Sequence, residues 1–186
     1  MAIKDYLYLV TKKPGKLMAA KKAFTRYDLG LKPVSKDFPE IQAESSLEIA
    51  RFTALQAALE LGHPSVREDH SFFIHALDLP GPYTNYVEKR LSAAMLIKLI
   101  DYLGDNTAHF EVATVLAYPA GKTIEYVFQV PVTLGSEVKG KDTKGWNGII
   151  RLYDEKRAIT EYPEEERLHI WNKGYEEIAR QYTSAI

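Results

Sequence analysis

The sequence predicts a mixed α/β fold in which helices pack on a mixed β-sheet. The first half of the chain alternates segments of strand and helix periodicity, which favours helices layered on a sheet. The second half contains two runs of apolar alternation, residues 109–117 and 124–132, around a Pro-Ala-Gly turn, which is the pattern of an antiparallel hairpin. A chain of 186 residues with 46% hydrophobic residues can bury the core of one domain or of two small lobes.

The apolar period assigns the elements in order along the chain. It predicts strands over residues 6–10, 66–77, 109–117, 124–132 and 149–153. It predicts a helix over residues 17–27, a second between Ser45 and Gly62, a third element over residues 86–103 as one helix or two, and a last helix over residues 164–182. The acidic stretch at the start of the last segment supports a helix that begins there, because acidic side chains are stabilised near the positive N-terminal end of a helix dipole. In the third helix the side chains expected to face inward are Leu91, Met95, Leu96, Leu99 and Ile100.

The second helix carries the strongest local signal. Ser45 and Glu48 have the spacing of a capping box, and Gly62 is placed to end the helix. Between them apolar residues recur at helical spacing from Ile49 to Leu59. We expect this stripe to be buried in the core.

Composition and charge exclude several classes of function. The 24 basic residues nearly balance the 25 acidic residues, so the chain has no overall field that attracts nucleic acid. It has no cysteine, which excludes disulfides, thiolate metal sites and cysteine nucleophiles. It shows neither a signal peptide nor a run of about 20 apolar residues that could span a bilayer. We expect a soluble, cytoplasmic protein that binds neither nucleic acid nor a membrane.

An acidic pair, Glu68-Asp69, interrupts the strand predicted over residues 66–77, and a Leu-Pro-Gly-Pro-Tyr turn follows. This pattern predicts two carboxylates at a strand end near the surface. Two or three carboxylates can hold Mg²⁺, with Mn²⁺ as the alternative, and leave coordination positions for water and phosphate. The candidate metal ligands are Glu44, Glu68 and Asp69.

Three lysines, Lys12, Lys13 and Lys16, lie on a Pro-Gly loop that leads into the first helix. Together with backbone N–H groups at the helix start they can neutralise phosphate oxygens. A metal ion beside such a site would lower the pKa of a bound water, and an unligated carboxylate could accept the proton of that water. The combination predicts hydrolysis of a phosphoanhydride.

Each of these features also has a structural interpretation. An acidic pair at a strand end is usually a solvated turn, and loop lysines are usually solvated surface that here lacks the Walker pattern. The five histidines show no metal-ligand spacing. Trp146 and Trp171 can stack on a base, but large aromatic residues more often anchor a core or an interface.

The order of four segments adds a resemblance to a known family. The chain resembles the inosine triphosphate pyrophosphatase family in four segments, residues 40–44, 48–50, 66–69 and 76–83. The last of them contains the Leu-Pro-Gly-Pro-Tyr turn. Its members hydrolyse noncanonical purine nucleoside triphosphates. The similarity is clearest over residues 40–90 and extends weakly over nearly the whole chain, so residues 1–186 are expected to form a single domain of this type. The resemblance implies a long mixed sheet that divides two α/β lobes, a nucleotide in the active-site cleft between them, and a homodimer.

The resemblance also implies roles for individual residues. Asp69 matches the essential acid that acts as general base or metal ligand, Glu68 matches its acidic neighbour, and Glu44 matches the metal-binding glutamate. The family's Thr-Gly-Asn-x-x-Lys loop is altered, since only Thr11 and Lys16 remain. The implied phosphate-binding residues are Thr11, Lys13, Lys16, Arg167 and Lys173.

The segments that read the base differ from the family pattern. The family's Gly-Phe/Trp-Gly-Tyr/Trp-Asp-Pro motif is represented by residues 145–148, and its Ser-His-Arg motif falls on residues 171–173. Because a buried polar site discriminates bases through paired hydrogen bonds, its replacement implies a different base preference. The candidate base-binding residues are Trp146, Asn147, Trp171 and Asn172.

Three hypotheses follow. The first is a Mg²⁺-dependent nucleoside triphosphate pyrophosphatase that cuts between the α- and β-phosphates and has altered base specificity. The second is a catalytically weakened paralogue that binds a nucleotide or a partner protein, which the altered loop and reader motifs favour and the retained acids oppose. The third is a structural or interaction protein, which would show no shift in melting temperature with nucleotide or metal.

Overall fold

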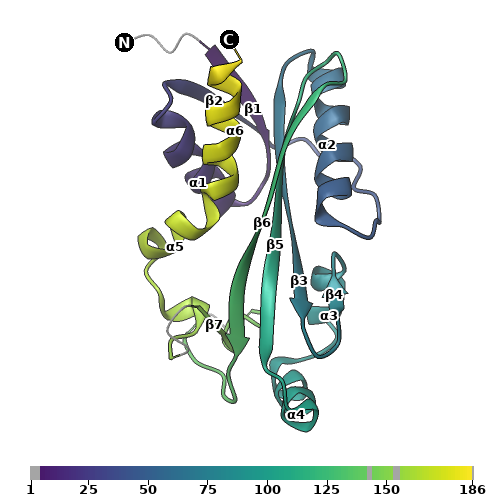
Figure 1. The fold of residues 1–186 in the computed structure, drawn as a ribbon, viewed down its shortest axis with the longest axis vertical. Coiled ribbons are helices and arrows are strands. Elements are labelled where there is room, and N and C mark those ends of the chain that lie inside the picture. The colour runs from purple at the N-terminus through teal and green to yellow at the C-terminus, as the bar shows by residue number, and fades with distance from the viewer. Residues whose placement is uncertain (1–4, 142–143, 153–155, 186) are drawn as a thin grey trace. The chain divides into compact units, whose positions relative to one another are not determined.

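Figure 1 shows the computed structural model, which describes residues 5–141, 144–152 and 156–185. The strands are β1 (Asp5–Val10), β2 (Leu29–Val34), β3 (Ser65–Ile74), β4 (Leu79–Gly81), β5 (Thr107–Ala117), β6 (Thr123–Leu134) and β7 (Ile150–Arg151). The helices are α1 (Pro14–Thr25), α2 (Ser46–Leu61), α3 (Thr84–Glu88), α4 (Ala93–Leu103), α5 (Glu164–Trp171) and α6 (Lys173–Ser184), with a 3₁₀ turn at Ile159–Glu161. This arrangement confirms the predicted mixed α/β fold.

The strands form one mixed sheet with the order β2-β1-β3-β5-β6-β7, and β4 pairs with β3 beside this path. Strand β1 runs parallel to both β2 and β3. Strand β4 is antiparallel to β3, and β7 is antiparallel to β6. Strands β5 and β6 are neighbours joined by the predicted turn, in which the Gly121 N–H donates to the Tyr118 carbonyl at 2.9 Å.

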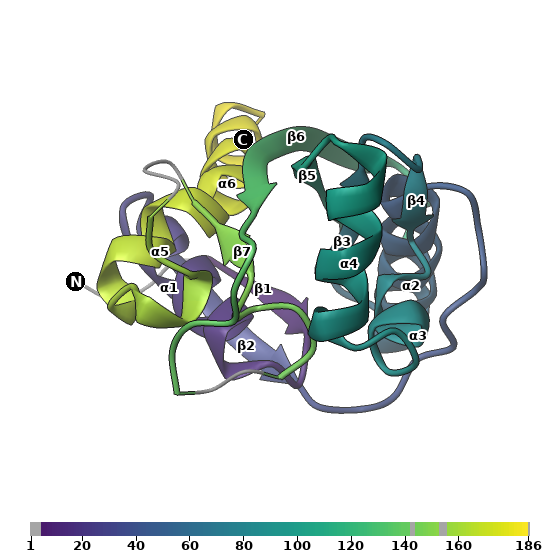
Figure 2. The same ribbon diagram turned by 90° about the horizontal axis from the view of Figure 1, so that it is seen from below.

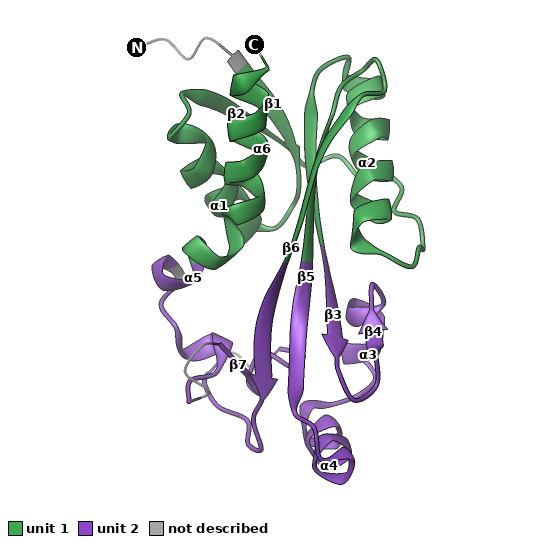
Figure 3. Cartoon of the chain, in the orientation of Figure 1, with its two compact units in different colours: residues 1–69, 112–128, 168–186 green, residues 70–111, 129–167 purple. Residues whose placement is uncertain are grey.

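The chain divides into two compact units, coloured separately in Figure 3. Unit 1 comprises residues 1–69, 112–128 and 168–186, and unit 2 comprises residues 70–111 and 129–167. No helix within the described ranges is both long enough and apolar enough to cross a membrane.

In unit 1, helices cover both faces of the sheet (Figure 1). Alternate side chains of a strand point to opposite faces, so β5 contributes to two cores. The core on the α2 side contains Ala113, Val115 and Ala117 of β5 with Ala50, Ala54 and Ala58 of α2. The core on the α1 and α6 side contains Leu116 of β5, Leu7 and Leu9 of β1, Val66 of β3, Phe24 of α1 and Ile178 of α6.

In unit 2, Trp146 is the largest fully buried side chain. Its ring lies 6.0 Å from that of Phe72, and its Nε1 donates to the Leu91 carbonyl at 2.8 Å. The inward face predicted for the third helix is correct for Leu96 and Ile100, which α4 buries. It is wrong for Met95, which is 58% exposed.

The predicted start and end of the second helix are confirmed. The Ser45 hydroxyl accepts from the Glu48 N–H at 3.2 Å, and Gly62 ends α2 in the left-handed conformation. The predicted buried stripe is wrong at Leu59, which is 68% exposed. Small residues, mainly alanines, line the buried face of α2 instead, because they allow the helix to approach β5 closely.

We expect Ser45→Ala to destabilise the protein by about 1 kcal/mol, because an N–H at the start of α2 loses its acceptor. Chemical denaturation measures the loss. Ser45→Asp is the matched control, since its carboxylate can still accept that hydrogen bond. An equal loss in both variants would show that the cap is not the cause.

Several predicted elements differ from the structure in their bounds. Helix α1 begins at Pro14, three residues before the predicted start, because proline is well suited to the first position of a helix. The single helix predicted over residues 164–182 is two helices, α5 and α6, that meet at Asn172 (Figures 1 and 2). The last predicted strand is limited to Ile150–Arg151 among the described residues, and its predicted end at Tyr153 lies outside them.

Candidate active site

Strand β3 carries the acidic pair, and it runs without interruption from Ser65 to Ile74. The prediction that Glu68 and Asp69 lie at a strand end near the surface is therefore wrong. Glu68 is on the same face as Val66, which belongs to the core between the sheet and helices α1 and α6. Asp69 points to the opposite face, because neighbouring side chains of a strand alternate.

Glu68 is one of the few buried charged residues, and its side chain is only 1% exposed. Lys16 of α1 reaches it from the first turn of the helix. The Lys16 ammonium lies 3.5 Å from Glu68 Oε1 and donates to the Glu68 backbone carbonyl at 2.8 Å. Burial lowers the pKa of Lys16, whereas the charges of Glu68 and Asp69 act in the opposite direction.

Tyr175 of α6 completes this buried cluster. It is fully buried, and its ring packs edge to face on Phe24 with centroids 6.0 Å apart. Burial, and then the charge of Glu68, raises the pKa of the Tyr175 hydroxyl well above its ordinary value. Glu68 thus lies in a protein interior between a lysine and a phenol, an environment that suits a positioning group better than a solvent-exposed metal ligand.

Asp69 is half-buried and lies among charged groups of both signs. Burial raises the pKa of its carboxyl, the positive charges of Lys16 and Arg67 lower it, and Glu40 raises it. The net direction is upward, so desolvation outweighs the two cations. A carboxylate with a raised pKa is a better proton acceptor than an ordinary surface aspartate.

The three acids proposed from sequence as metal ligands do not converge. Glu44 is exposed near the start of α2, and Glu68 and Asp69 occupy opposite faces of β3. Among the described residues no group of three His, Asp or Glu side chains is arranged to hold a metal ion. The acid that does act on Asp69 is Glu40, which sequence reasoning missed although it opens the segment that carries the family resemblance.

The donor chemistry around Asp69 still suits a magnesium ion. Mg²⁺ is usually bound through one or two carboxylates together with substrate phosphates and water, rather than by a complete cage of protein ligands. Asp69 and Glu40 are two carboxylates of this kind. Glu40 is 60% exposed, and one of its oxygens accepts a hydrogen bond from Arg67.

The loop before α1 ends in a helix N-terminus. Thr11 Oγ1 accepts from the Lys13 N–H at 3.1 Å, and Lys13 is the residue immediately before the first turn of α1. The side chain of Lys13 is exposed, whereas that of Lys16 turns inward to Glu68. The predicted phosphate residues Thr11, Lys13 and Lys16 therefore share one short segment with the first backbone N–H groups of α1, which belong to Gly15 and Lys16 because Pro14 has none.

Residues 171–173 join α5 to α6. Asn172 is buried, and its Nδ2 donates to Glu176 at 2.8 Å, which commits this amide to the helix start. Trp171 is half-buried at the edge of the unit 1 core. Lys173 is exposed, with its ammonium 5.9 Å from the centroid of the Phe128 ring.

The remaining predicted residues belong to unit 2. Trp146 is 1% exposed, so this conformation leaves no ring face on which a base could stack. Asn147 beside it is exposed. Arg167 is half-buried, and its Nε has no hydrogen-bond partner in the described part of the chain, which leaves a donor for an anion.

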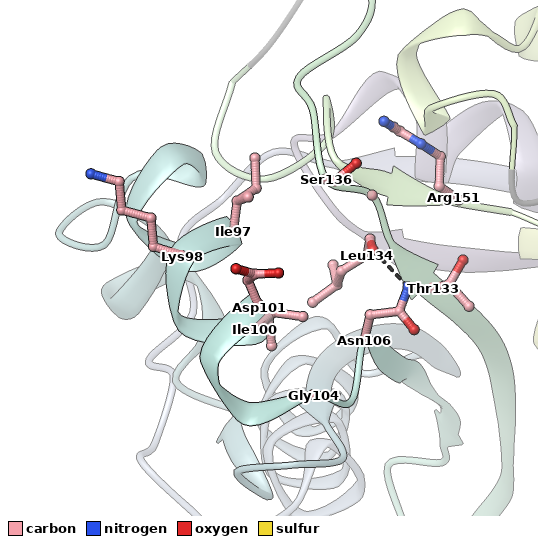
Figure 4. Close-up of a pocket in the computed structure, with 11 residues that line it drawn as sticks. Ile97, Lys98, Ile100, Asp101, Gly104, Asn106, Thr133, Leu134, Ser136 and Arg151 are labelled. Carbon is pink, nitrogen blue, oxygen red and sulfur yellow. Dashed lines mark hydrogen bonds between the residues drawn. The ribbon is translucent and has the colours of Figure 1, made fainter.

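Unit 2 also contains a pocket of about 660 Å³, shown in Figure 4. It lies between α4 and the end of β6 with the residues that follow, and Asp101, Asn106, Ser136 and Arg151 are among its polar lining. The Asn106 amide is held by the Leu134 carbonyl at 3.0 Å. None of the site residues predicted from sequence lines this pocket.

The chain is similar in sequence to proteins of a known family. A model of the Ham1 family matches residues 7–175. The dITP/XTP pyrophosphatase of Methanopyrus kandleri is 30% identical over 177 residues, which cover 92% of this chain and 93% of that protein. The dITP/XTP pyrophosphatase of Ignicoccus hospitalis is 30% identical over 170 residues, 90% of each protein.

Solved structures show the same fold at lower sequence identity. The nucleoside-triphosphatase / dITP/XTP pyrophosphatase of Mycobacterium abscessus matches with a TM-score of 0.71 and 17% identity over 97% of both chains. A HAM1 protein of Coxiella burnetii matches with a TM-score of 0.71 and 20% identity, over 97% of this chain and 96% of that one. The fold and the family that the sequence motifs predict are both confirmed.

Proposed function

Because the chain belongs to the Ham1 family, we propose that it is a nucleoside triphosphate pyrophosphatase. It cuts noncanonical purine nucleoside triphosphates between the α- and β-phosphates and releases a monophosphate and pyrophosphate. The observation that carries this proposal is Asp69, a half-buried carboxylate with a raised pKa that lies between the charges of Lys16 and Arg67. Relatives named dITP/XTP pyrophosphatase align with nearly the whole chain, which supports the same reaction class.

Asp69 acts as the general base in this proposal. Its raised pKa strengthens it as an acceptor of the proton from the attacking water, and the positive charges of Lys16 and Arg67 favour its ionised form. Glu68 acts through Lys16, because its buried carboxylate fixes the position of the lysine ammonium. We therefore treat Glu68 as a positioning residue, although the sequence suggested a catalytic and metal-binding role.

Mg²⁺, with Mn²⁺ as the alternative, is the proposed cofactor. Asp69 and Glu40 would hold the ion together with phosphate oxygens of the substrate, whereas Glu44 lacks supporting geometry. When bound, the ion would neutralise phosphate charge and lower the pKa of water.

The phosphates are bound at the start of α1 in this proposal. Lys13 offers an exposed ammonium, and the first N–H groups of α1 offer hydrogen-bond donors beside Thr11. Lys173, which also belongs to unit 1, offers an exposed ammonium. Arg167 of unit 2 stays a prediction as a phosphate ligand, and its Nε has no hydrogen-bond partner among the described residues.

Base recognition is proposed to differ from that of the family pattern. The Trp146 ring is buried in the core, and the Asn172 amide donates to Glu176 at the start of α6. Asn147 and Trp171 are therefore the better candidates for base contacts. An amide offers a donor and an acceptor to the base, but it cannot reproduce the charge of an arginine.

The proposal is tested with a panel of standard and noncanonical nucleoside triphosphates, including ITP, XTP and their deoxy forms. We expect pyrophosphate release with noncanonical purines in Mg²⁺, and loss of release when EDTA removes the metal. The relative rates of pyrophosphate release from the different bases show which base the altered base-binding residues prefer. A folded protein that releases no pyrophosphate from any of these substrates would instead favour a paralogue that binds a nucleotide or a partner without turnover.

A further inference from the structure

Arg67 lies two residues before Asp69 on β3, so both side chains are on the same face of the sheet. Its Nη1 donates to the carbonyl of Val10, the last residue of β1, at 3.2 Å. Its Nη2 forms an ion pair with the Glu40 carboxylate. Arg67 thus connects the end of β1, the loop that carries Glu40, and the proposed general base.

The charges around Lys16 and Asp69 are balanced in the protein alone. Three carboxylates face three cations, and these are Glu40, Glu68 and Asp69 against Lys13, Lys16 and Arg67. A divalent cation added to this cluster creates an excess of positive charge, and its two proposed carboxylates already interact with the Arg67 guanidinium. A triphosphate added together with the metal removes this excess of positive charge, because its negative charge exceeds that of the ion.

The guanidinium also keeps an unused donor. Arg67 Nε is buried, and it has no hydrogen-bond partner among the residues that the structure describes. Arginine presents its donors as a planar fork that fits phosphate oxygens, and such charge-assisted bonds are stronger than neutral ones. If Nη2 releases Glu40, Nε and Nη2 form an edge that is available to a phosphate group.

We propose that Arg67 couples metal binding to triphosphate binding by exchanging Glu40 for a phosphate group. This inference rests on the proposed function. In the free protein Arg67 takes the position of a counter-ion for Glu40 and Asp69 and opposes the binding of a metal alone. When metal and triphosphate bind together, Glu40 turns to the metal and Arg67 turns to the phosphate.

The exchange predicts opposite changes in two affinities when Arg67 is replaced by glutamine. Isothermal titration of metal-free protein with Mn²⁺, without nucleotide, is expected to show about 10-fold tighter binding by Arg67→Gln than by wild type. Titration with inorganic triphosphate in EDTA is expected to show about 10-fold weaker binding by the same variant. Partial unfolding would weaken both, so the opposite signs separate the exchange from a loss of structure.

Two further variants serve as controls. Arg51→Gln removes another arginine of unit 1 that pairs with a glutamate, Glu125, and both of its affinities should equal those of wild type. Arg67→Lys keeps the positive charge but loses the fork, so Mn²⁺ affinity should stay near that of wild type while triphosphate affinity falls. The inference is overturned if Arg67→Gln leaves both affinities unchanged, shifts both in the same direction, or binds no Mn²⁺.

These measurements use binding alone, so they can be separated from the fate of the proposed function. Pyrophosphate release from ITP by the wild-type protein tests the function directly. Turnover by wild type combined with unchanged affinities in Arg67→Gln would contradict the exchange and leave the function intact. Opposite affinity changes without turnover by wild type would support the exchange and contradict the hydrolase.

Discussion

Asp69→Asn is expected to lower kcat by about 10²–10⁴-fold while making the protein more stable. The loss of turnover follows because the amide cannot accept the proton of the attacking water. The gain in stability follows because the folded protein raises the pKa of Asp69, chiefly by burial. An ionised Asp69 therefore costs folding free energy at neutral pH, and the neutral amide does not carry this cost.

The sign of this effect can be tested by changing pH. The pKa of Asp69 is higher in the folded state than in the unfolded state, so the folded state binds a proton at this group more tightly. The wild type therefore loses the stability contributed by this group as pH rises through the folded-state pKa. Asp69→Asn should melt higher than wild type at pH 7, by about 2–4 °C for each kcal/mol gained in a chain of this size. The difference should shrink on acidification, when Asp69 becomes protonated.

Asp101→Asn is the matched control, since Asp101 is an exposed aspartate on α4. It should leave both kcat and the melting temperature at the wild-type values. Comparable turnover by Asp69→Asn and wild type would contradict the assignment of the base. A lower melting temperature of Asp69→Asn at pH 7 would contradict the dominance of burial over the neighbouring cations.

The second large effect is expected at Lys16. Lys16→Met leaves the Glu68 carboxylate buried without its lysine partner, and removal of one partner of a buried pair typically costs about 3–5 kcal/mol. Urea denaturation at pH 7 measures the loss in the free energy of unfolding. Lys22→Met, at an exposed lysine of the same helix, should change stability by less than about 0.5 kcal/mol.

A double variant identifies the cause of that loss. In Lys16→Met/Glu68→Gln the buried negative charge is removed together with its partner, so most of the lost stability should return. If the double variant is as unstable as the sum of the two single variants, the ion pair is not the source of the effect. Restored stability without restored turnover would agree with a role of Lys16 at the phosphates.

The parts of the fold that were predicted correctly depend on short-range chemistry. Ser45 and Gly62 bound α2 because a hydroxyl acceptor and a left-handed glycine act within one helical turn. The β5–β6 hairpin follows from apolar alternation on either side of a turn. The helical period that includes Leu59 was predicted correctly, but Leu59 was wrongly placed on the buried face. The face of α2 that packs on β5 is formed by Ala50, Ala54 and Ala58.

The parts that failed depend on contacts distant in sequence. Two adjacent acids indicate the end of a strand when read locally, yet β3 continues because a lysine 52 residues earlier provides the partner that allows Glu68 to be buried. The pairing of Arg67 with Glu40 spans 27 residues and has no local signature. Trp146 matched a base-binding motif by its position, whereas its burial against Phe72 is decided by the packing of unit 2.

The central claim is that this chain cuts a nucleoside triphosphate between its α- and β-phosphates with Asp69 as the base. Phosphorus NMR of ITP incubated with Mg²⁺ and the wild-type protein or Asp69→Asn tests it most directly, because it identifies the bond that breaks. We expect IMP and pyrophosphate from the wild type and unchanged ITP from the variant. Formation of IDP and phosphate, equal product from both proteins, or unchanged ITP with a folded wild type would contradict it.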